Sequence, residues 1–253
     1  MALNLQAILE APIIHLDTID STNNYAMQLI DADKAQPGLT IVANEQTSGK
    51  GQRGKQWVGV PGESLLMSLI VQPEHKLDSQ FAFNAAVATA IAEVLGELVT
   101  DTNVRIKWPN DMIVNDKKTG GILIENVLRG SQWMYSVIGI GINVLQTHFP
   151  EELPYATSLR METGKIFNIN KLCIALRKNI VNNIYSLRSN EESIEQYNNY
   201  LYKRDMDQRF SDTSGEWMAH IHKVIDTGQL LVTREDGKVE QYSHGQVVWV
   251  WGN

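Results

Sequence analysis

Three cations stand within six residues of one glycine-rich segment, Gly49-Lys50-Gly51-Gln52-Arg53-Gly54-Lys55-Gln56-Trp57. Glycine lets backbone N–H groups approach an anion closely, and the cations Lys50, Arg53 and Lys55 would neutralise it, so the segment predicts an anion-binding loop. A solvated surface loop explains the same charges, because runs of charge usually lie in solvent. The spacing contains G-x-G-x-x-G, but Pro61 and nearby glycines prevent the helix that must follow in a dinucleotide site. No Gly-Lys-Ser/Thr closes the segment, which excludes a Walker A loop.

A second polar group is Lys107-Trp108-Pro109-Asn110-Asp111, followed by Lys118 just before Gly120-Gly121. The Asn-Asp pair after a proline sets two oxygen-bearing side chains at a strand end, which suits Mg²⁺ or a ribose. An Asx turn between two strands is the simpler explanation of the pair alone. Lys118 could project over bare backbone toward a ligand, or lie exposed in its turn.

Gly139 and Gly141 stand at alternate positions of a predicted strand, in Gly139-Ile140-Gly141-Ile142-Asn143. Their spacing removes side chains from one face of the strand, as expected where a flat ligand lies against the backbone. Tight packing between a helix and the sheet would also explain it.

The elements that position these residues are predicted from periodicity and apolar runs. Strands are expected over 16–22, 38–44, 64–71, 104–108, 112–114, 120–127 and 135–144. Helical spacing predicts a long helix over 81–99, with others over 24–30, 170–187 and 191–202. Asp20 or Ser21 is expected to cap the helix over 24–30. After about Arg209, short strands over 218–225, 229–234, 239–242 and 246–251 predict a small SH3-like β-barrel.

The composition, with 43% hydrophobic and 20% charged residues among 253, is that of a globular protein. A formal net charge of −7 argues against a general nucleic-acid binder, which needs a clustered positive face. No run reaches the ~18 apolar residues of a membrane span, and the N-terminus lacks the features of a signal peptide. The single cysteine, Cys173, excludes an internal disulfide, lies in an apolar run typical of a packed thiol, and fits a reducing cytoplasm.

Taken together and in order, these segments resemble biotin–protein ligases. The resemblance rests on Asp20-Ser21-Thr22-Asn23, Gln46 with the 49–57 loop, Lys107–Asp111, Lys118–Leu123 and Gly139–Asn143. It runs from about Leu16 to Leu159 and again through the C-terminal strands. It implies an α+β fold, with a mixed, largely antiparallel sheet flanked by helices as in class II synthetases. The domains are then a catalytic domain over 1–208 and an SH3-like barrel over 209–253.

The family resemblance also implies an ATP-dependent reaction, that of a biotin–[acetyl-CoA-carboxylase] ligase. The biotin carboxylate attacks the α-phosphorus of ATP, giving biotinyl-5′-adenylate and pyrophosphate. A lysine of a biotin carboxyl carrier domain then attacks the anhydride and expels AMP. Because no enzyme nucleophile is needed, catalysis must come from orientation and charge stabilisation, with Mg²⁺ sharing the work.

Roles follow from the same resemblance. Lys118 is the expected catalytic lysine, bridging biotin carboxylate and α-phosphate, with Arg53 assisting. The biotin-binding residues are expected to be Ser21, Thr22, Asn23 and Gln46 at the ureido ring, Lys50, Gly51 and Gln52 in the closing loop, and Lys118, Gly121, Gly139 and Gly141. The ATP side is expected to be Gly49, Arg53, Lys55, Trp57, Asn110, Asp111 and, at the adenine, Asn143, with Asp111 also a ligand of Mg²⁺.

Some family members are also repressors with an N-terminal helix-turn-helix, but only fifteen residues precede Leu16. We therefore expect no DNA partner, no membrane, and a monomer or homodimer. Lipoate and octanoate ligases share the scaffold but lack the loop ending at Trp57 together with Lys107–Asp111. A module that only sequesters biotin would not need Lys118, Asn110 and Asp111.

The loop departs from the family pattern, because many members have arginine at the positions of Lys50 and Gln52. Lysine keeps the charge but loses the bidentate fork, and glutamine loses the charge, although Arg53 is adjacent. We expect the biotinyl adenylate to dissociate moderately faster from the wild type than from the variant Gln52→Arg. Measuring both off-rates tests this, and equal rates would contradict it.

Overall fold

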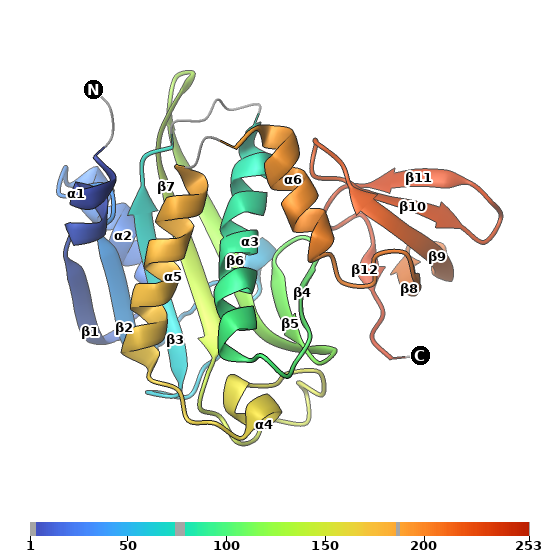
Figure 1. The fold of residues 1–253 in the computed structure, drawn as a ribbon, viewed down its shortest axis with the longest axis horizontal. Coiled ribbons are helices and arrows are strands. Elements are labelled where there is room, and N and C mark those ends of the chain that lie inside the picture. Colours follow the sequence, from blue (N-terminus) through green and yellow to red (C-terminus); the bar gives the residue numbers. More distant parts are fainter. Residues whose placement is uncertain (1–3, 74–78, 186–187, 253) are drawn as a thin grey trace.

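The computed structural model describes residues 4–73, 79–185 and 188–252. A large sheet covered by helices is followed by a smaller sheet at the C-terminal end (Figure 1). The large sheet has seven strands in the order β1-β2-β3-β7-β6-β5-β4. The strands are β1 Ile13–Ile19, β2 Thr40–Gln46, β3 Ser64–Val71, β4 Val104–Lys107, β5 Asp111–Val114, β6 Lys117–Arg129 and β7 Gln132–Asn143. Among the seven strands described for this sheet, only β1 and β2 pair in parallel, so the predicted mixed, largely antiparallel sheet is confirmed.

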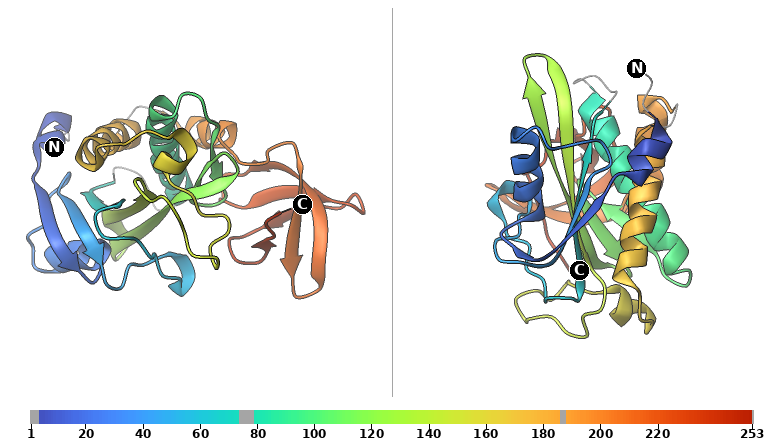
Figure 2. Two further views of the ribbon diagram at one scale, coloured as in Figure 1. Left: turned by 90° about the horizontal axis from the view of Figure 1, so that it is seen from below. Right: turned by 90° about the vertical axis from the view of Figure 1, so that its left-hand side faces the viewer.

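Helices cover both faces of this sheet. Viewed from one end, the sheet separates α2 (Thr22–Asp31) from α1 (Leu5–Glu10), α3 (Gln80–Leu98) and α5 (Ile169–Ile184) (Figure 2, right). Along β3, Met67 and Leu69 belong to the core beneath α3 and α5, whereas Ile70 packs with α2 on the other face. All eight residues of β3 are buried for this reason.

Helix α3 lies over the sheet between the helices α5 and α6 (Asn190–Asn199) (Figure 1). Its length and apolar composition alone would suit a membrane span, but 67% of that stretch is buried inside the fold. A helix that is apolar all round is expected in the core of a protein of this size. Residues 186 and 187 of the helix predicted over 170–187 lie outside the described residues.

Two short helices, α1 and α4 (Leu159–Thr163), were not predicted. Arg177 of α5 is 5% exposed and donates hydrogen bonds to the carbonyls of Ile8 (2.9 Å) and Ala11 (2.6 Å). These bonds satisfy carbonyl groups at and just after the end of α1, where the regular intrahelical hydrogen bonds stop. A helix of six residues is not stable on its own. Helix α1 is held in place by Arg177, which is far along the chain, and its sequence therefore shows no clear helical pattern.

The small sheet is antiparallel, with strands in the order β11-β10-β9-β8-β12. Its strands are β8 Asp207–Asp212, β9 Gly215–Val224, β10 Leu230–Arg234, β11 Val239–Tyr242 and β12 Val248–Trp249. Strand β8 was not predicted and crosses the expected boundary between residues 208 and 209. Among the described residues no pairing joins the edge strands β11 and β12, so a closed SH3-like barrel is not confirmed.

Buried polar contacts hold the small sheet against the rest of the chain. Asn198 of α6, 2% exposed, donates to the carbonyl of Val224 (2.9 Å) and accepts from its N–H (2.7 Å). The indole N–H of Trp108 donates to the carbonyl of Gly228 at 2.9 Å. Because these groups are satisfied only when the two parts are docked, the contacts fix how the small sheet sits.

Cys173 lies on the buried face of α5 and is 2% exposed, and burial raises the pKa of its thiol to about 11. The thiolate is the reactive form, so native Cys173 should react with a disulfide reagent at pH 8 about 100-fold more slowly than after denaturation. The native rate should rise with pH up to that pKa. Rapid stoichiometric labelling of the folded protein at pH 8 would show that the thiol is not packed.

Candidate functional site

The large and small sheets together enclose a cavity of about 670 Å³. Residues from all the motifs singled out in the sequence meet in its wall. The predicted residues that line it are Ser21, Thr22, Asn23, Gln46, Lys50, Gly51, Gln52, Arg53, Lys55, Trp57, Asn110, Asp111, Lys118, Gly121, Gly139 and Gly141. Gly49 and Asn143 are not in the lining.

One end of the cavity is a network of neutral hydrogen-bonding groups. The side-chain oxygen of Gln46, at the end of β2, accepts from the backbone N–H (2.7 Å) and the hydroxyl (3.0 Å) of Thr22. Thus Gln46 satisfies the first N–H of α2, while Ser21 occupies the N-cap position without a side-chain cap bond. The Asp20 carboxylate accepts from Asn24 instead, so neither residue caps as predicted.

The network continues through Asn23 to the facing strands. The Ser68 hydroxyl lies 2.6 Å from Asn23 Oδ1, and Asn23 Nδ2 donates to Glu125 at 2.7 Å. Glu125 also pairs with Lys50 at 3.3 Å, which ties the glycine-rich loop to β6. Ser68 and Glu125 were missed in the sequence, because an isolated serine or glutamate in an apolar strand gives no motif. With Asn23 and Thr22 almost fully buried, this end of the cavity is organised before any ligand arrives.

The alternate glycines of β7 lie directly beneath the side chains of Asn23 and Trp57. A Cβ on Gly139 would stand 2.3 Å from Asn23 Oδ1, and one on Gly141 would stand 2.5 Å from the indole of Trp57. The flat group that covers Gly141 in this structure is thus a side chain of the protein. The buried indole Nε1 of Trp57 has no hydrogen-bond partner within the described part of the chain, so it can donate to a ligand.

The other end of the cavity holds a carboxylate between two ammonium groups. Asp111 pairs with Lys118 at 2.7 Å and with Lys107 at 3.3 Å, and its side chain is 16% exposed. Burial alone would raise the pKa of Asp111, but the charges of Lys107 and Lys118 outweigh it and hold the pKa below its ordinary value. Burial lowers the pKa of Lys107. Two cations against one anion leave this end with a net positive charge, which suits an anionic ligand.

The glycine-rich loop forms a tight turn over the cavity. Gly51 N–H donates to the carbonyl of Lys55 at 2.7 Å, and residues 52–54 make one 3₁₀ turn with Arg53 at φ 55°. The Arg53 guanidinium crosses to the small sheet and donates to the carbonyl of His244 at 2.8 Å. Arg53 therefore links the two sheets here rather than standing free in solvent.

The small sheet contributes a wall of the cavity that sequence reasoning did not assign. Lys107 belongs to a predicted motif but had no role, although its ammonium lies 5.4 Å from the Trp249 ring centroid and 5.3 Å from that of Trp251. The paired tryptophans near the end of the chain were the available signal. The C-terminal residues in the lining are Phe210, His244, Gly245, Val247, Val248, Trp249 and Trp251.

The two predicted residues outside the lining support its shape. Gly49 has its backbone against that of Trp57, whose N–H donates to the Gly49 carbonyl at 2.9 Å. Asn143 is 6% exposed and donates to the carbonyl of Thr157 at 3.1 Å. In this arrangement the amide of Asn143 links β7 to the segment before α4.

The oxygen donors at the cationic end suit Mg²⁺ only together with a phosphate ligand. The Asn110 amide donates to the carbonyl of Ile122 at 2.5 Å, and Asp111 supplies the carboxylate. Mg²⁺ takes six oxygen ligands, so one carboxylate and one amide oxygen leave most positions to phosphate and water. The donor set fits an ion that arrives with a nucleotide.

Comparisons with known proteins agree with this site. The model of the biotin/lipoate A/B protein ligase family matches residues 16–143. The bifunctional ligase/repressor BirA of Salmonella typhimurium is 30% identical over 241 residues, covering 92% of this chain and 72% of that protein. The BirA of Bacillus spizizenii is 36% identical over 156 residues, covering 60% of this chain and 47% of that protein. The match thus spans about half the length of the latter relative.

The fold is also that of a solved structure. A biotin protein ligase from Aquifex aeolicus, in complex with biotin and ATP, superposes with a TM-score of 0.76 at 25% sequence identity. The superposition covers 93% of this chain and 97% of that chain, so it includes both sheets.

Asp111→Asn would leave the ammonium of Lys107 buried without its charged partner. We expect the free energy of unfolding at pH 7 to fall by about 3 kcal/mol in urea titrations. Because the folded-state pKa of Asp111 is lowered, its stabilisation is present above about pH 4 and is lost as the pH falls through the folded-state pKa. The difference between the two proteins should therefore shrink in acid.

The matched control is Asp226→Asn, which changes an exposed carboxylate and should leave stability within about 0.5 kcal/mol. The double variant Lys107→Met/Asp111→Asn should recover most of the loss, since it removes the buried charge as well. An Asp111→Asn protein as stable as the wild type would mean that the carboxylate does not compensate Lys107.

Proposed function

The chain belongs to the biotin/lipoate A/B protein ligase family, and from this premise we propose that it is an ATP-dependent biotin–protein ligase. The observation that carries the proposal is the order of groups along one cavity. A neutral hydrogen-bonding end at Thr22 and Asn23 is followed by the apolar ring of Trp57 over the bare backbone of Gly141, and then by the cationic end at Lys118. Biotin has the same order: a ureido ring, an aliphatic chain and a carboxylate.

The first step joins two anions, so the cavity must gather negative charge. The biotin carboxylate oxygen attacks the α-phosphorus of ATP, the bond to the bridging oxygen breaks, and pyrophosphate leaves. Lys118 lies where carboxylate and phosphate would meet, and Asp111 keeps its ammonium oriented at 2.7 Å until they arrive. Holding both reactants beside fixed cations supplies the orientation and charge stabilisation that the step needs. When bound, Mg²⁺ supplies further neutralisation of the phosphates, with Asp111 and Asn110 as the residues that would hold it.

In the second step, the amine of an acceptor lysine attacks the carbonyl carbon of the anhydride. AMP leaves, and the amine loses a proton as the amide forms. The loop residues Lys50, Gly51 and Gln52, with Trp57, would cover the anhydride and keep water away from it. Their place over the cavity supports this role.

The family also includes lipoate ligases, and the neutral end of the cavity favours biotin over lipoate. A dithiolane ring has no N–H or carbonyl group to exchange hydrogen bonds with Thr22, Asn23 and Gln46. Burying these polar groups against a ring without hydrogen-bonding partners would cost binding free energy.

The acceptor we propose is a biotin carboxyl carrier domain of a carboxylase, with the reaction in the cytoplasm. The family resemblance supports this acceptor, and the single reduced thiol of Cys173 suits a reducing compartment.

We also propose that the small sheet is an SH3-like domain of its own. The last strand, β12, pairs with the first, β8, which brings the end of the segment back to its start as a barrel requires. Since β8 begins at Asp207, the boundary is better placed just before that residue than at 208/209.

Pyrophosphate release from ATP and Mg²⁺ tests the proposal. We expect release with biotin, none above background with lipoate, and a loss of at least about 100-fold in Lys118→Ala, because a charge that stabilises the transition state is removed. Lys117→Ala is the matched control, since the neighbouring lysine is 48% exposed, pairs with Glu162 at 3.7 Å and lies outside the cavity lining. Release with lipoate, or no release with either acid, would overturn the assignment.

A further inference from the structure

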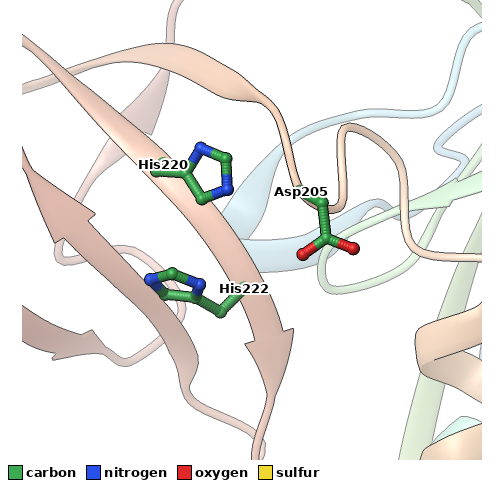
Figure 3. A group of neighbouring side chains, drawn as sticks. All are labelled: Asp205, His220 and His222. Atoms are coloured by element: carbon green, nitrogen blue, oxygen red, sulfur yellow. The ribbon is translucent and has the colours of Figure 1, made fainter.

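A second group of side chains with metal-ligand chemistry lies in the small sheet, outside the cavity lining. Asp205, His220 and His222 each offer one ligand atom, and these three atoms lie within 4.8 Å of one another. Figure 3 shows both imidazole rings on the same side of β9, with the Asp205 carboxylate facing them from the neighbouring segment. Neither the family match nor the proposed reaction uses these residues.

The backbone holds the three side chains together. The N–H of Asp205 donates to the carbonyl of Ile221, the residue between the two histidines, at 2.8 Å. Ile221 in turn donates to the carbonyl of Met206 at 3.0 Å, so the segment runs alongside β9 as an extension of β8. Asp205 adopts φ 58°, a conformation that asparagine and aspartate tolerate better than other side-chain-bearing residues.

A β-bulge sets the direction of His222. In the pairing of β9 with β10, Leu231 opposes Lys223 while Val232 opposes Ile221, so His222 has no partner in the ladder. Such bulges redirect a side chain and are frequent beside functional sites. Here the ring of His222 lies beside that of His220, with their centroids 5.2 Å apart.

Each histidine already has one ring nitrogen occupied by a partner that suits metal ligation. His220 Nδ1 lies 3.0 Å from the Asp207 carboxylate, and His222 Nε2 lies 2.7 Å from the Thr233 hydroxyl. Histidines that bind metals typically donate one N–H to a carboxylate or another oxygen and bind the ion through the other nitrogen. The atoms left for a ligand are therefore His220 Nε2 and His222 Nδ1. The guanidinium of Arg204 lies 3.7 Å from one Asp205 oxygen, outside hydrogen-bond distance.

We propose that Asp205, His220 and His222 form a binding site for a borderline divalent transition-metal ion, with Zn²⁺ as the best fit. Two imidazole nitrogens and one carboxylate suit Zn²⁺, whereas Mg²⁺ and Ca²⁺ prefer oxygen ligands alone. Ligand atoms around a tetrahedral Zn²⁺ stand about 3.3 Å apart, so small side-chain rotations would bring the three atoms onto one ion. The fourth position is open to water.

Such an ion would join the segment that connects the two sheets to the middle of β9. Just before Asp205, Tyr202 donates to the carbonyl of Ile106 in β4 at 2.9 Å. Zinc at this site would therefore stabilise the attachment of the small sheet, whose far end forms part of the cavity wall.

Titration of the chelator-treated full chain with Zn²⁺, against a chromophoric chelator as competitor, tests the site. We expect one equivalent to bind to the wild type and the double variant His220→Ala/His222→Ala to bind at least 100-fold more weakly. Co²⁺ in place of Zn²⁺ should give the intense visible bands of a four-coordinate ion, and these should be absent in the double variant. Asp205→Asn should weaken binding by about tenfold while preserving the shape of the side chain.

The matched control is His15→Ala/His148→Ala, which removes two histidines outside the cluster and should leave Zn²⁺ affinity unchanged. Circular dichroism and biotin-dependent pyrophosphate release confirm that each variant is folded. Equal Zn²⁺ affinity in the wild type and the folded double variant would overturn the proposal. So would loss of binding in the His15/His148 control.

Discussion

A carboxylate buried against two ammonium groups is the interaction on which the rest of the cavity depends. Asp111 pairs with Gly121 across β5 and β6, and its position opposite bare backbone leaves room above the sheet. Lys118 reaches Asp111 because the ladder shifts between Met112 and Ile113, which leaves Thr119 without a partner. Without that shift Lys118 would point to the opposite face, since a one-residue slip reverses every side chain.

The neutral end of the cavity depends on the same sheet through a different device. Strand β3 is buried on both faces, and Ser68 is the position on the cavity side whose hydroxyl donates to Asn23 Oδ1. Opposite it, Gly139 provides the space that the Asn23 amide occupies. A polar network in a buried strand is stable only when its members are satisfied, and Gln46 of β2 and Glu125 of β6 complete it.

Much of this could be predicted from the sequence, and the rest follows from contacts that no local pattern encodes. Apolar runs and periodicity gave β3 and α3 nearly to the residue, because both are buried and regular. Strand β8 was missed, since Asp207–Asp212 is mostly polar and is a strand only because β9 and β12 pair with it. The motif residues were found by type and order. Their partners Ser68 and Glu125 were not, because hydrogen bonding between distant strands leaves no mark in spacing.

The role of the small sheet shows this limit most clearly. Its strands give a plain pattern of short hairpins, and apart from the paired tryptophans near the end of the chain nothing indicates that they help to close a site whose Arg53 lies 191 residues before His244. Yet a Cβ on Gly245 would lie 1.3 Å from the Arg53 guanidinium. Arg53 of the glycine-rich loop can therefore donate to the His244 carbonyl only because the next residue, Gly245, has no side chain. The glycine is needed for the contact as well as for its own positive φ of 87°. If Arg53 contacts the phosphates of a ligand, as proposed, it must give up this bond, and capture of that ligand would then be coupled to the seating of the small sheet.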